Sequence, residues 1–226
     1  MRHLLLFGKL PRLGRVKTRL VPPLSPAEAQ RLYRAFLDDQ LRFLRSFELS
    51  ARIAWWTDEE PSPAEFADLS LDGIDVRLQA SGNLGTRLWH AFDQTSSGGP
   101  GPIVIIGADS PTLPAAHVRA AFAVLEAGAP AVIAPAADGG YVLVGMNEPR
   151  RELFADVSWG GADVAATTRC RAQEIGIELA EIDPWYDVDE VHALQRLRGE
   201  IDGPRGAERA PATARYLLDL GLPPVL

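Results

Sequence analysis

The segment 101–114, GPIVIIGADSPTLP, constrains the fold more than any other part of the chain. Residues 103–106 form an unbroken β-branched run, which is typical of a strand buried on both faces of a parallel sheet. The proline-containing segment 111–114 then ends the strand and begins a helix. Ligands of open α/β sheets bind at the carboxyl ends of strands, so Asp109 is a candidate to hold a divalent cation against a phosphate. A turn or helix-capping role explains Asp109 equally well at this point.

Apolar patterning elsewhere predicts an alternation of strands and helices, and therefore an α/β fold. The segment 25–28 is a capping box that begins a long amphipathic helix, whose apolar stripe includes Tyr33, Leu37, Leu41 and Leu44. Further strands are predicted at 4–7, 52–57, 75–79, 131–134, 141–146 and 178–182. Further helices are predicted from after residue 87 to about 92, from 114 to 127, after an Asp163 cap, from 189 to 199 and from 211 to 220, with one short helix within 58–71 and a flexible connector at 95–101.

The composition limits the class of protein and its partners. A length of 226 residues favours a single domain over 1–226. The formal charge of −7 argues against nucleic acid as the main partner. The single cysteine, Cys170, excludes an internal disulfide framework and suits the reducing cytoplasm. Because no apolar stretch is long enough for a signal peptide or a membrane span, we expect a soluble cytoplasmic protein. The oligomeric state is left open.

The loop after the first predicted strand concentrates positive charge. Of the 23 basic residues only two are lysines, and both, Lys9 and Lys17, lie in this loop. Backbone N–H groups and cations at this position form the phosphate grip of doubly wound folds, although neither the P-loop nor the dinucleotide motif is present. The alternative is a solvated basic loop. The residues of the predicted grip are Gly8, Lys9, Arg12, Gly14, Arg15, Lys17 and Arg19.

Two glycine-containing segments are weaker candidates for ligand contacts. Asn83 and Gly85 follow the third predicted strand, where small and polar residues suit a nucleotide contact. Asp138 precedes the adjacent glycines Gly139 and Gly140, which permit a close approach by a ligand or by backbone. A tight turn is the alternative interpretation of the second segment, because Asp-Gly is common in turns.

A second acidic position follows the last predicted strand. Asp187 and Asp189 lie two residues apart in an extended segment and therefore face the same side. If they face Asp109 across a cleft, the three carboxylates complete a two-sided cation site, whereas Asp189 could instead be a helix N-cap. The four histidines have no metal-ligand spacing, and neither a nucleophile elbow nor a Cys–His pair is present.

Taken together, the motifs FGKLPRLGRVKTRL, GADSP, DGGYVLVG, FADVSW and WYDVDEVHAL resemble a bacterial family of glycosyltransferase-like proteins. That family belongs to the nucleotide-diphospho-sugar transferase (GT-A) superfamily, and some members are described as arsenosugar-biosynthesis glycosyltransferases. The similarity runs from residue 3 to about residue 198. More distantly, the KTRL and DVD segments resemble 2-phospholactate and molybdenum-cofactor guanylyltransferases.

The resemblance implies a three-layer, Rossmann-like, mostly parallel sheet, a bound nucleotide and Mg²⁺ or Mn²⁺. Asp109 matches the acidic position after the central strand, and Lys17 and Arg19 match the basic pair of the first loop. Gly160 and Gly161 stand where hydroxyl residues are usual in the family, and Glu190 and Val191 replace the usual Thr-Pro after the Asp-x-Asp pattern. The residues implied to face the second substrate are Asp138, Gly139, Gly140, Tyr141 and Trp159.

Our primary hypothesis is metal-dependent glycosyl transfer from a nucleotide sugar to a small acceptor. Asp109, with Asp187 or Asp189, would hold the cation, Lys17 and its neighbouring arginines would bind phosphates, and Asp138 would orient or deprotonate an acceptor hydroxyl. The second hypothesis is nucleotidylyl transfer, in which a phosphorylated substrate attacks a nucleoside triphosphate and releases pyrophosphate. A third is a nucleotide-binding protein without catalysis.

Overall fold

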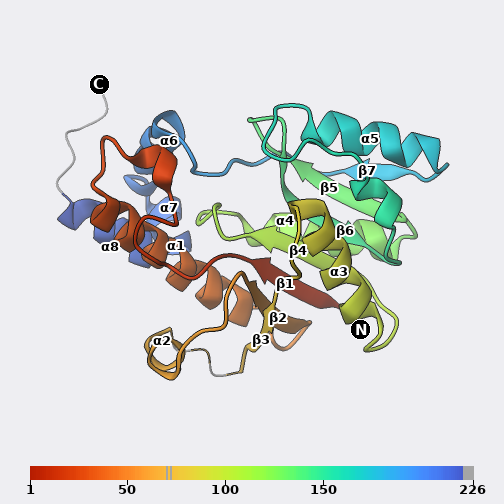
Figure 1. Cartoon of the computed structure of the whole chain (residues 1–226), viewed down its shortest axis with the longest axis horizontal. Coiled ribbons are helices and arrows are strands. Elements are labelled where there is room, and N and C mark those ends of the chain that lie inside the picture. Colours follow the sequence, from red (N-terminus) through yellow and green to blue (C-terminus); the bar gives the residue numbers. More distant parts are fainter. Residues whose placement is uncertain (70, 72, 221–226) are drawn as a thin grey trace.

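Seven strands form one sheet in the order β3-β2-β1-β4-β6-β5-β7 in the part of the chain that is described (Figure 1). The structure is a computed structural model that describes residues 1–69, 71 and 73–220. Residues 70, 72 and 221–226, which the predicted domain includes, lie outside the described residues. The strands are β1 (His3–Phe7), β2 (Arg52–Thr57), β3 (Asp75–Leu78), β4 (Ile103–Gly107), β5 (Ala131–Pro135), β6 (Tyr141–Met146) and β7 (Leu179–Glu181).

The sheet is parallel except at β6, which pairs antiparallel with both β4 and β5. Only a short turn at 136–140 joins β5 to β6, and such a connection is too short for the crossover that parallel neighbours require. The amino end of β6 therefore lies at the same edge of the sheet as the carboxyl ends of β4 and β5. This arrangement brings Asp138 and Tyr141 to the edge that carries Asp109, and it confirms the predicted mostly parallel sheet.

Helices cover both faces of the sheet, so the predicted three layers are confirmed (Figure 1). The helices are α1 (Pro26–Arg45), α2 (Pro63–Asp68), α3 (Leu84–Ser96), α4 (Ala115–Glu126), α5 (Val164–Glu174), α6 (Val191–Ile201), α7 (Pro204–Arg209) and α8 (Pro211–Asp219), with short 3₁₀ helices η1 (Thr18–Leu20) and η2 (Arg151–Phe154). Alternate residues of β1 enter different cores: Leu4 and Leu6 pack with α1 and α4, whereas Leu5 and Phe7 pack with α3 and α5.

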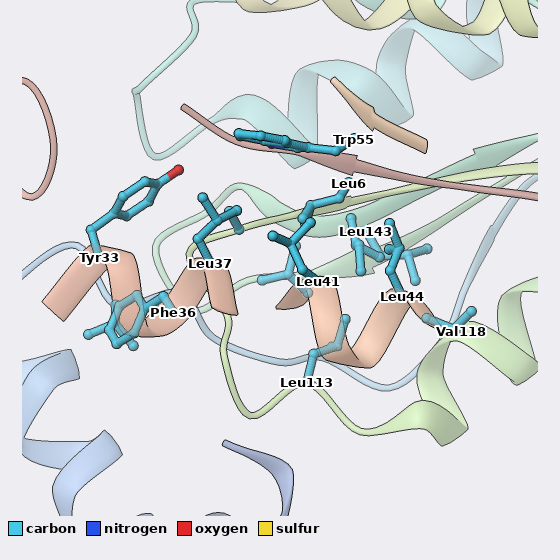
Figure 2. Close-up of a cluster of buried hydrophobic side chains, with 14 of the residues drawn as sticks. Leu6, Tyr33, Phe36, Leu37, Leu41, Leu44, Trp55, Leu113, Val118 and Leu143 are labelled. Atoms are coloured by element: carbon cyan, nitrogen blue, oxygen red, sulfur yellow. The ribbon is translucent and has the colours of Figure 1, made fainter. Parts of the chain in front are cut away.

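The predicted capping box and apolar stripe of α1 are confirmed. The Ser25 hydroxyl accepts a hydrogen bond from the Glu28 amide, and the Glu28 carboxylate accepts one from the Ser25 amide. Figure 2 shows Leu37 and Leu41 of the stripe pointing from α1 toward the sheet, where Leu6 lies. This buried face fixes α1 beneath β1 and supports the loop that precedes it.

Several predicted boundaries are wrong. Helix α3 begins at Leu84 instead of after Arg87, because the Asn83 side chain caps it there. It continues through Ser96 instead of ending near Phe92, because Thr95 extends the buried face that packs on the sheet. The predicted connector at 95–101 therefore begins after the helix. Helix α6 passes through Gly199 to Ile201, since Ile201 extends the buried stripe by one turn. In both cases tertiary packing overrides the local preference of Ser, Thr and Gly for a helix end.

Short helix α7 was not predicted, and Glu190, not Asp189, is the N-cap residue of α6.

Within the described residues, no helix has both the length and the apolar character required to cross a bilayer.

Candidate functional site

Lys17 joins three segments that are distant in the sequence. Its Nζ contacts Oδ1 of Asp109, which follows β4, and lies 2.7 Å from Oδ1 of Asp189, which precedes α6. The Lys17 side chain is 1% exposed, whereas those of Asp109 and Asp189 are 42% and 44% exposed. The ammonium is thus enclosed, while each carboxylate keeps a surface that a ligand can reach.

The backbone at Lys17 is left-handed, with φ 48° and ψ 36°. This conformation costs a non-glycine residue about 1 kcal/mol, so contacts beyond the loop must hold it. The two ion pairs do so, together with the rings of Tyr33 and Phe36, whose centroids lie 5.8 Å and 5.3 Å from Nζ. The position of Lys17 therefore depends on α1 as well as on the two acidic loops.

Burial and neighbouring charges shift the pKa values of Lys17, Asp187 and Asp189. Burial alone would lower the pKa of Lys17, but Asp109 and Asp189 raise it above its ordinary value. Burial would likewise raise the pKa of Asp189, but the Lys17 ammonium lowers it. The pKa of Asp187 is raised to about 6, first by burial and then by the charges of Asp138 and Asp189. Unlike Asp109 and Asp189, which pair with Lys17, Asp187 has no ion-pair partner in the described part of the chain.

Backbone hydrogen bonds align the segment 184–190 with the end of the sheet. The Val188 amide donates to the Asp109 carbonyl at 2.9 Å, and the Trp185 amide donates to the Pro135 carbonyl at 3.0 Å. The segment therefore runs beside the ends of β4 and β5, which sets Asp187 and Asp189 next to Asp109.

A buried polar network supports this alignment from behind. The Glu200 carboxylate on α6 accepts hydrogen bonds from the Tyr186 hydroxyl at 2.5 Å and from the Thr112 hydroxyl at 2.9 Å. Arg209 pairs with the other oxygen of Glu200 at 3.1 Å. Tyr186 and Thr112 lie close in sequence to Asp187 and Asp109, so Glu200 links the two acidic segments.

Two pockets adjoin this cluster. The first, which we term the basic pocket, has a volume of about 330 Å³ and carries the cations Lys9, Arg15, Lys17, Arg19 and Arg87. Its other lining residues are Phe7, Gly8, Val16, Thr18, Tyr33, Gln79, Leu84, Asp109 and Asp189. The charge suits a nucleotide phosphate.

The second, which we term the acidic pocket, has a volume of about 270 Å³ and carries the carboxylates of Asp109, Asp138, Asp187 and Asp189. Its remaining lining residues are apolar, aromatic or small: Phe7, Leu84, Leu88, Ile105, Ile106, Gly107, Ser110, Ala136, Gly140, Tyr141, Val142, Leu143, Val144, Trp159, Gly160, Gly161 and Val164. The two pockets share Asp109 and Asp189, so the Lys17 cluster lies at their common wall.

Several residues that line the basic pocket were not predicted. Tyr33 was interpreted as scaffold, yet its hydroxyl accepts the Lys9 amide at 2.7 Å and supports the pocket. Gln79 follows β3 and donates to the Gly8 carbonyl at 3.1 Å. Arg87 lies in the first turn of α3. Gln79 could have been predicted from its position at the end of a strand. No sequence feature marks Tyr33 as a pocket residue, because it fits the apolar stripe of α1.

Not all of the predicted phosphate grip comes together. Arg12 pairs with Glu59 at 2.8 Å and with Glu65 at 3.7 Å, and it is not among the lining residues of the basic pocket. Arg15 does line the pocket, but its guanidinium also pairs with Glu59, at 2.5 Å. Gly14 forms a turn with φ 71°. The acids of the β2–β3 connection thus pair with two arginines of the predicted grip, of which Arg15 lines the basic pocket and Arg12 does not.

The predicted pair Asn83 and Gly85 has structural roles. The Asn83 side chain accepts the Thr86 amide at 2.9 Å and caps α3. A Cβ atom on Gly85 would lie 2.8 Å from the Trp159 ring, so Gly85 permits that ring to pack against α3. Trp159 itself lines the acidic pocket, where its ring meets that of Tyr141 edge-on at 6.4 Å.

The segment 138–140 is a tight turn and also part of the acidic pocket. Asp138 Oδ1 accepts the Gly140 amide at 2.8 Å, as in an Asx-turn. Gly139 has φ 89°, and a Cβ there would lie 1.8 Å from the Ala162 carbonyl oxygen. The two interpretations of this segment are therefore compatible: the turn sets the Asp138 carboxylate at the pocket.

The donor set is suited to a cation that arrives with phosphates. Among the described residues, no group of three or more His, Cys, Asp or Glu side chains is arranged to ligate a metal by itself. Asp109 and Asp189 each give one oxygen to Lys17 and retain accessible surface. Mg²⁺ in nucleotide enzymes takes one or two carboxylates and completes its shell with phosphates and water. The residues present fit that mode better than a protein cage.

The family described as "Uncharacterized protein conserved in bacteria (DUF2064)" matches residues 42–161, more than half of the chain. No curated protein matches this chain significantly. A Desulfovibrio desulfuricans G20 crystal structure, provisionally described as a nucleotide-diphospho-sugar transferase, is 29% identical and superposes with a TM-score of 0.87, covering 96% of this chain and 94% of that one.

Two more distant structures share the fold. A cytidylyltransferase from Leptospira borgpetersenii is 11% identical, with a TM-score of 0.57 and coverage of 100% of this chain and 98% of that chain. A 4-diphosphocytidyl-2C-methyl-D-erythritol synthase is 10% identical, with a TM-score of 0.54 and coverage of 85% and 94%. The α/β fold is therefore that of nucleotide-diphospho-sugar transferases. These proteins include neither an arsenosugar enzyme nor a guanylyltransferase, so the narrower resemblances stay predictions.

Proposed function

The chain belongs to the DUF2064 family, and we propose that it is a transferase that binds a nucleotide sugar and transfers the glycosyl group to a small acceptor. One observation carries the proposal: the Lys17 ammonium, shared by Asp109 and Asp189, lies at the common wall of a basic and an acidic pocket. A donor diphosphate fits the first pocket and an acceptor the second, which puts the bond to be broken at that wall.

The basic pocket would bind the donor diphosphate. Lys9 and Arg19 are exposed cations able to approach phosphate oxygens, and Arg87 approaches from α3. Lys17 is enclosed and prepositioned, so its charge needs no reorganisation as negative charge develops on the departing nucleoside diphosphate. Arg15 would exchange its contact with Glu59 for the phosphate.

Mg²⁺ or Mn²⁺ belongs to the proposal as a partner of the diphosphate. Asp109 and Asp189 would hold the cation through their accessible oxygens, with Asp187 beside them. When bound, the cation would supply electrostatic stabilisation of the leaving diphosphate. The raised pKa of Asp187 supports this assignment, because it marks a carboxylate with no protein cation to offset it.

Asp138 would act on the acceptor. Its carboxylate lines the acidic pocket and is held in one orientation by the Gly140 amide. From there it can accept a hydrogen bond from an acceptor hydroxyl and remove the proton as the glycosidic bond forms. Tyr141 and Trp159 would form the wall against which the acceptor lies.

The five cations of the basic pocket favour a second candidate, nucleotidylyl transfer, because a triphosphate requires more countercharge than a diphosphate. In that reaction a phosphorylated substrate attacks the α-phosphate and pyrophosphate leaves. A nucleotide-binding protein without catalysis is the third candidate, and it predicts binding with no product.

A thermal-shift screen of nucleotides and nucleotide sugars, with and without Mg²⁺, identifies the donor, because a ligand of the folded state raises Tm. Product analysis then separates the candidates: nucleoside diphosphate for glycosyl transfer, pyrophosphate for nucleotidylyl transfer. Acceptors of the arsenosugar type belong in the panel because of the family resemblance. The proposal is contradicted if no compound of the panel raises Tm and none yields a product.

The Asp109→Asn variant tests the assigned site. We expect a loss of activity of about 100-fold, the size seen when one preorganised electrostatic group is removed. The matched control is Asp183→Asn, which removes an exposed carboxylate that lines neither pocket. Equal activity in the two variants would show that Asp109 does not take part in the reaction.

A further inference from the structure

The acidic pocket contains no cation that could bind a phosphorylated substrate. Its lining residues include four aspartates and no Lys, Arg or His. Lys17, at the common wall, already offsets Asp109 and Asp189. No ion pair in the described part of the chain involves Asp138 or Asp187. The pocket therefore presents net negative charge to whatever enters it.

Basic side chains occur beyond these carboxylates. Arg19 and Arg196 line a separate groove of about 370 Å³, which shares Asp138, Asp187 and Asp189 with the acidic pocket. Arg19 is 3.8 Å from Glu190, so part of its charge is offset within that groove. Asp138, Asp187 and Asp189 line both cavities, so an anion held by those arginines would lie beside the same carboxylates.

The remaining walls suit a ligand with an apolar face. Trp159 and Tyr141 offer ring surfaces, and the buried side chains of Leu88 and Leu143 also line the pocket. The pocket also includes Ser110, which is fully buried and whose Oγ has no hydrogen-bond partner.

We propose that the second substrate of this enzyme is an uncharged or cationic molecule with a hydroxyl group and an apolar face, and not a phosphorylated one. The inference rests on the proposed function and names the substrate class of the same site. A phosphate brings two negative charges to a pocket lined by four aspartates and by no Lys, Arg or His, whereas an ammonium can pair with Asp138, which lies outside the proposed cation site. The same charge pattern favours glycosyl transfer over nucleotidylyl transfer to a phosphate.

Three probes that share one ring test the inference: benzyl alcohol, benzylamine and benzyl phosphate, with charges of about 0, +1 and −2 at neutral pH. The full-length protein is labelled with 5-fluorotryptophan, and the Trp159→Phe variant assigns the Trp159 signal among those of the five tryptophans by ¹⁹F NMR. We expect the alcohol and the amine to shift the Trp159 signal at concentrations at least tenfold lower than the phosphate requires. Equal or tighter binding of benzyl phosphate, or no response to any probe, overturns the inference.

Matched variants assign the selection to the aspartates. Asp138→Asn and Asp187→Asn should each reduce the preference for benzylamine over benzyl phosphate by about threefold or more, while Asp183→Asn should leave it unchanged. An unchanged preference in both pocket variants contradicts the proposal.

The experiments distinguish a failure of the proposed function from a failure of the inference about the second substrate. If no nucleotide raises Tm, the proposed function fails even where the probes show charge selection. If nucleotides bind and benzyl phosphate also binds well, only the inference about the second substrate fails.

Discussion

At the scale of single residues, Lys17 shows how a side chain can be fixed by its charge partners. It is a buried cation in a left-handed backbone conformation, held by two acids and two aromatic rings. Removing the ammonium leaves Asp109 and Asp189 facing each other. The cluster should therefore matter for stability even before a ligand binds.

We predict that Lys17→Met lowers the free energy of unfolding at pH 7 by about 2 kcal/mol, less than for a fully buried pair because both acids are partly exposed. The pKa of Asp189 is lowered in the folded protein, so its stabilisation is present above the unfolded pKa and is lost as pH falls. The gap between wild type and variant should therefore narrow below about pH 4. Urea unfolding at several pH values measures it, with exposed Lys9→Met as control. A gap independent of pH would refute the ion-pair explanation.

The ionisation of Asp187 affects stability in the opposite direction to that of Asp189. Its pKa is raised to about 6 in the folded state, so its contribution to stability is fully present below the unfolded pKa and is lost as pH rises through 6. Asparagine does not ionise. We expect Asp187→Asn to be about 1 kcal/mol more stable than wild type at pH 8 in EDTA, after screening by solvent, and equal to it near pH 4. Thermal denaturation across this range is the measurement, and a destabilised variant at pH 8 would contradict it.

At the scale of elements, the site depends on how α6 fixes the segment 184–190. Glu200 links Tyr186 to Thr112, and the Val188 amide bonds to the Asp109 carbonyl. The acids of two loops are thus held in register by a helix that contributes no charged group to either pocket.

We predict that Tyr186→Phe lowers stability by about 1 kcal/mol and speeds hydrogen exchange at the Val188 amide, because a buried hydrogen bond is lost. The matched control is Tyr216→Phe, which removes the hydrogen bond from that hydroxyl to the Glu28 carbonyl in α1. The control should lose similar stability without faster exchange at Val188. The same exchange rate in both variants would mean that Glu200 does not position the segment.

The turn between β5 and β6 depends on close contact with the loop before α5. Gly139→Ala should destabilise the protein by several kcal/mol, because φ is 89° and the new Cβ would lie 1.8 Å from the Ala162 carbonyl oxygen. Gly160→Ala is the matched control: φ is 88°, but no atom lies within 4 Å of a Cβ there. It should cost only about 1 kcal/mol. Equal losses in denaturant unfolding would show that backbone strain alone matters.

At the scale of the whole molecule, charge is segregated. The chain carries a formal charge of −7, yet five cations line the basic pocket. The overall field repels nucleotides at a distance, while the pocket attracts them at short range. Affinity for phosphates must therefore come from local contacts, and salt should weaken it.

We predict that the Kd of the best-bound nucleoside diphosphate rises about tenfold between 50 mM and 500 mM NaCl, measured by calorimetry. Arg19→Gln should weaken binding and reduce this salt dependence. Arg52→Gln, which removes an exposed cation at the opposite end of the sheet, should leave both unchanged. An affinity that does not respond to salt would contradict phosphate binding in the basic pocket.

The sequence by itself determined the elements and the edge of the sheet at which the chemistry-bearing residues lie. The capping box before α1, the β-branched run of β4 and the placement of Asp109 depend on side chains within a few residues of one another. Such short-range preferences can be recognised from the sequence alone. They predicted the strands closely and the α/β class, whereas the three layers came from the family resemblance.

Only the tertiary structure decided which charges meet. Lys17 pairs with Asp109 and Asp189, whereas Arg12, five residues earlier in the same loop, pairs with Glu59. The residues near either cation do not predict which acid it meets. The reversal of β6 and the separation into a basic and an acidic pocket likewise depend on strand order, which long-range packing selects. Charge pairing is a property of distances across the fold, and those distances exist only once the sheet has formed.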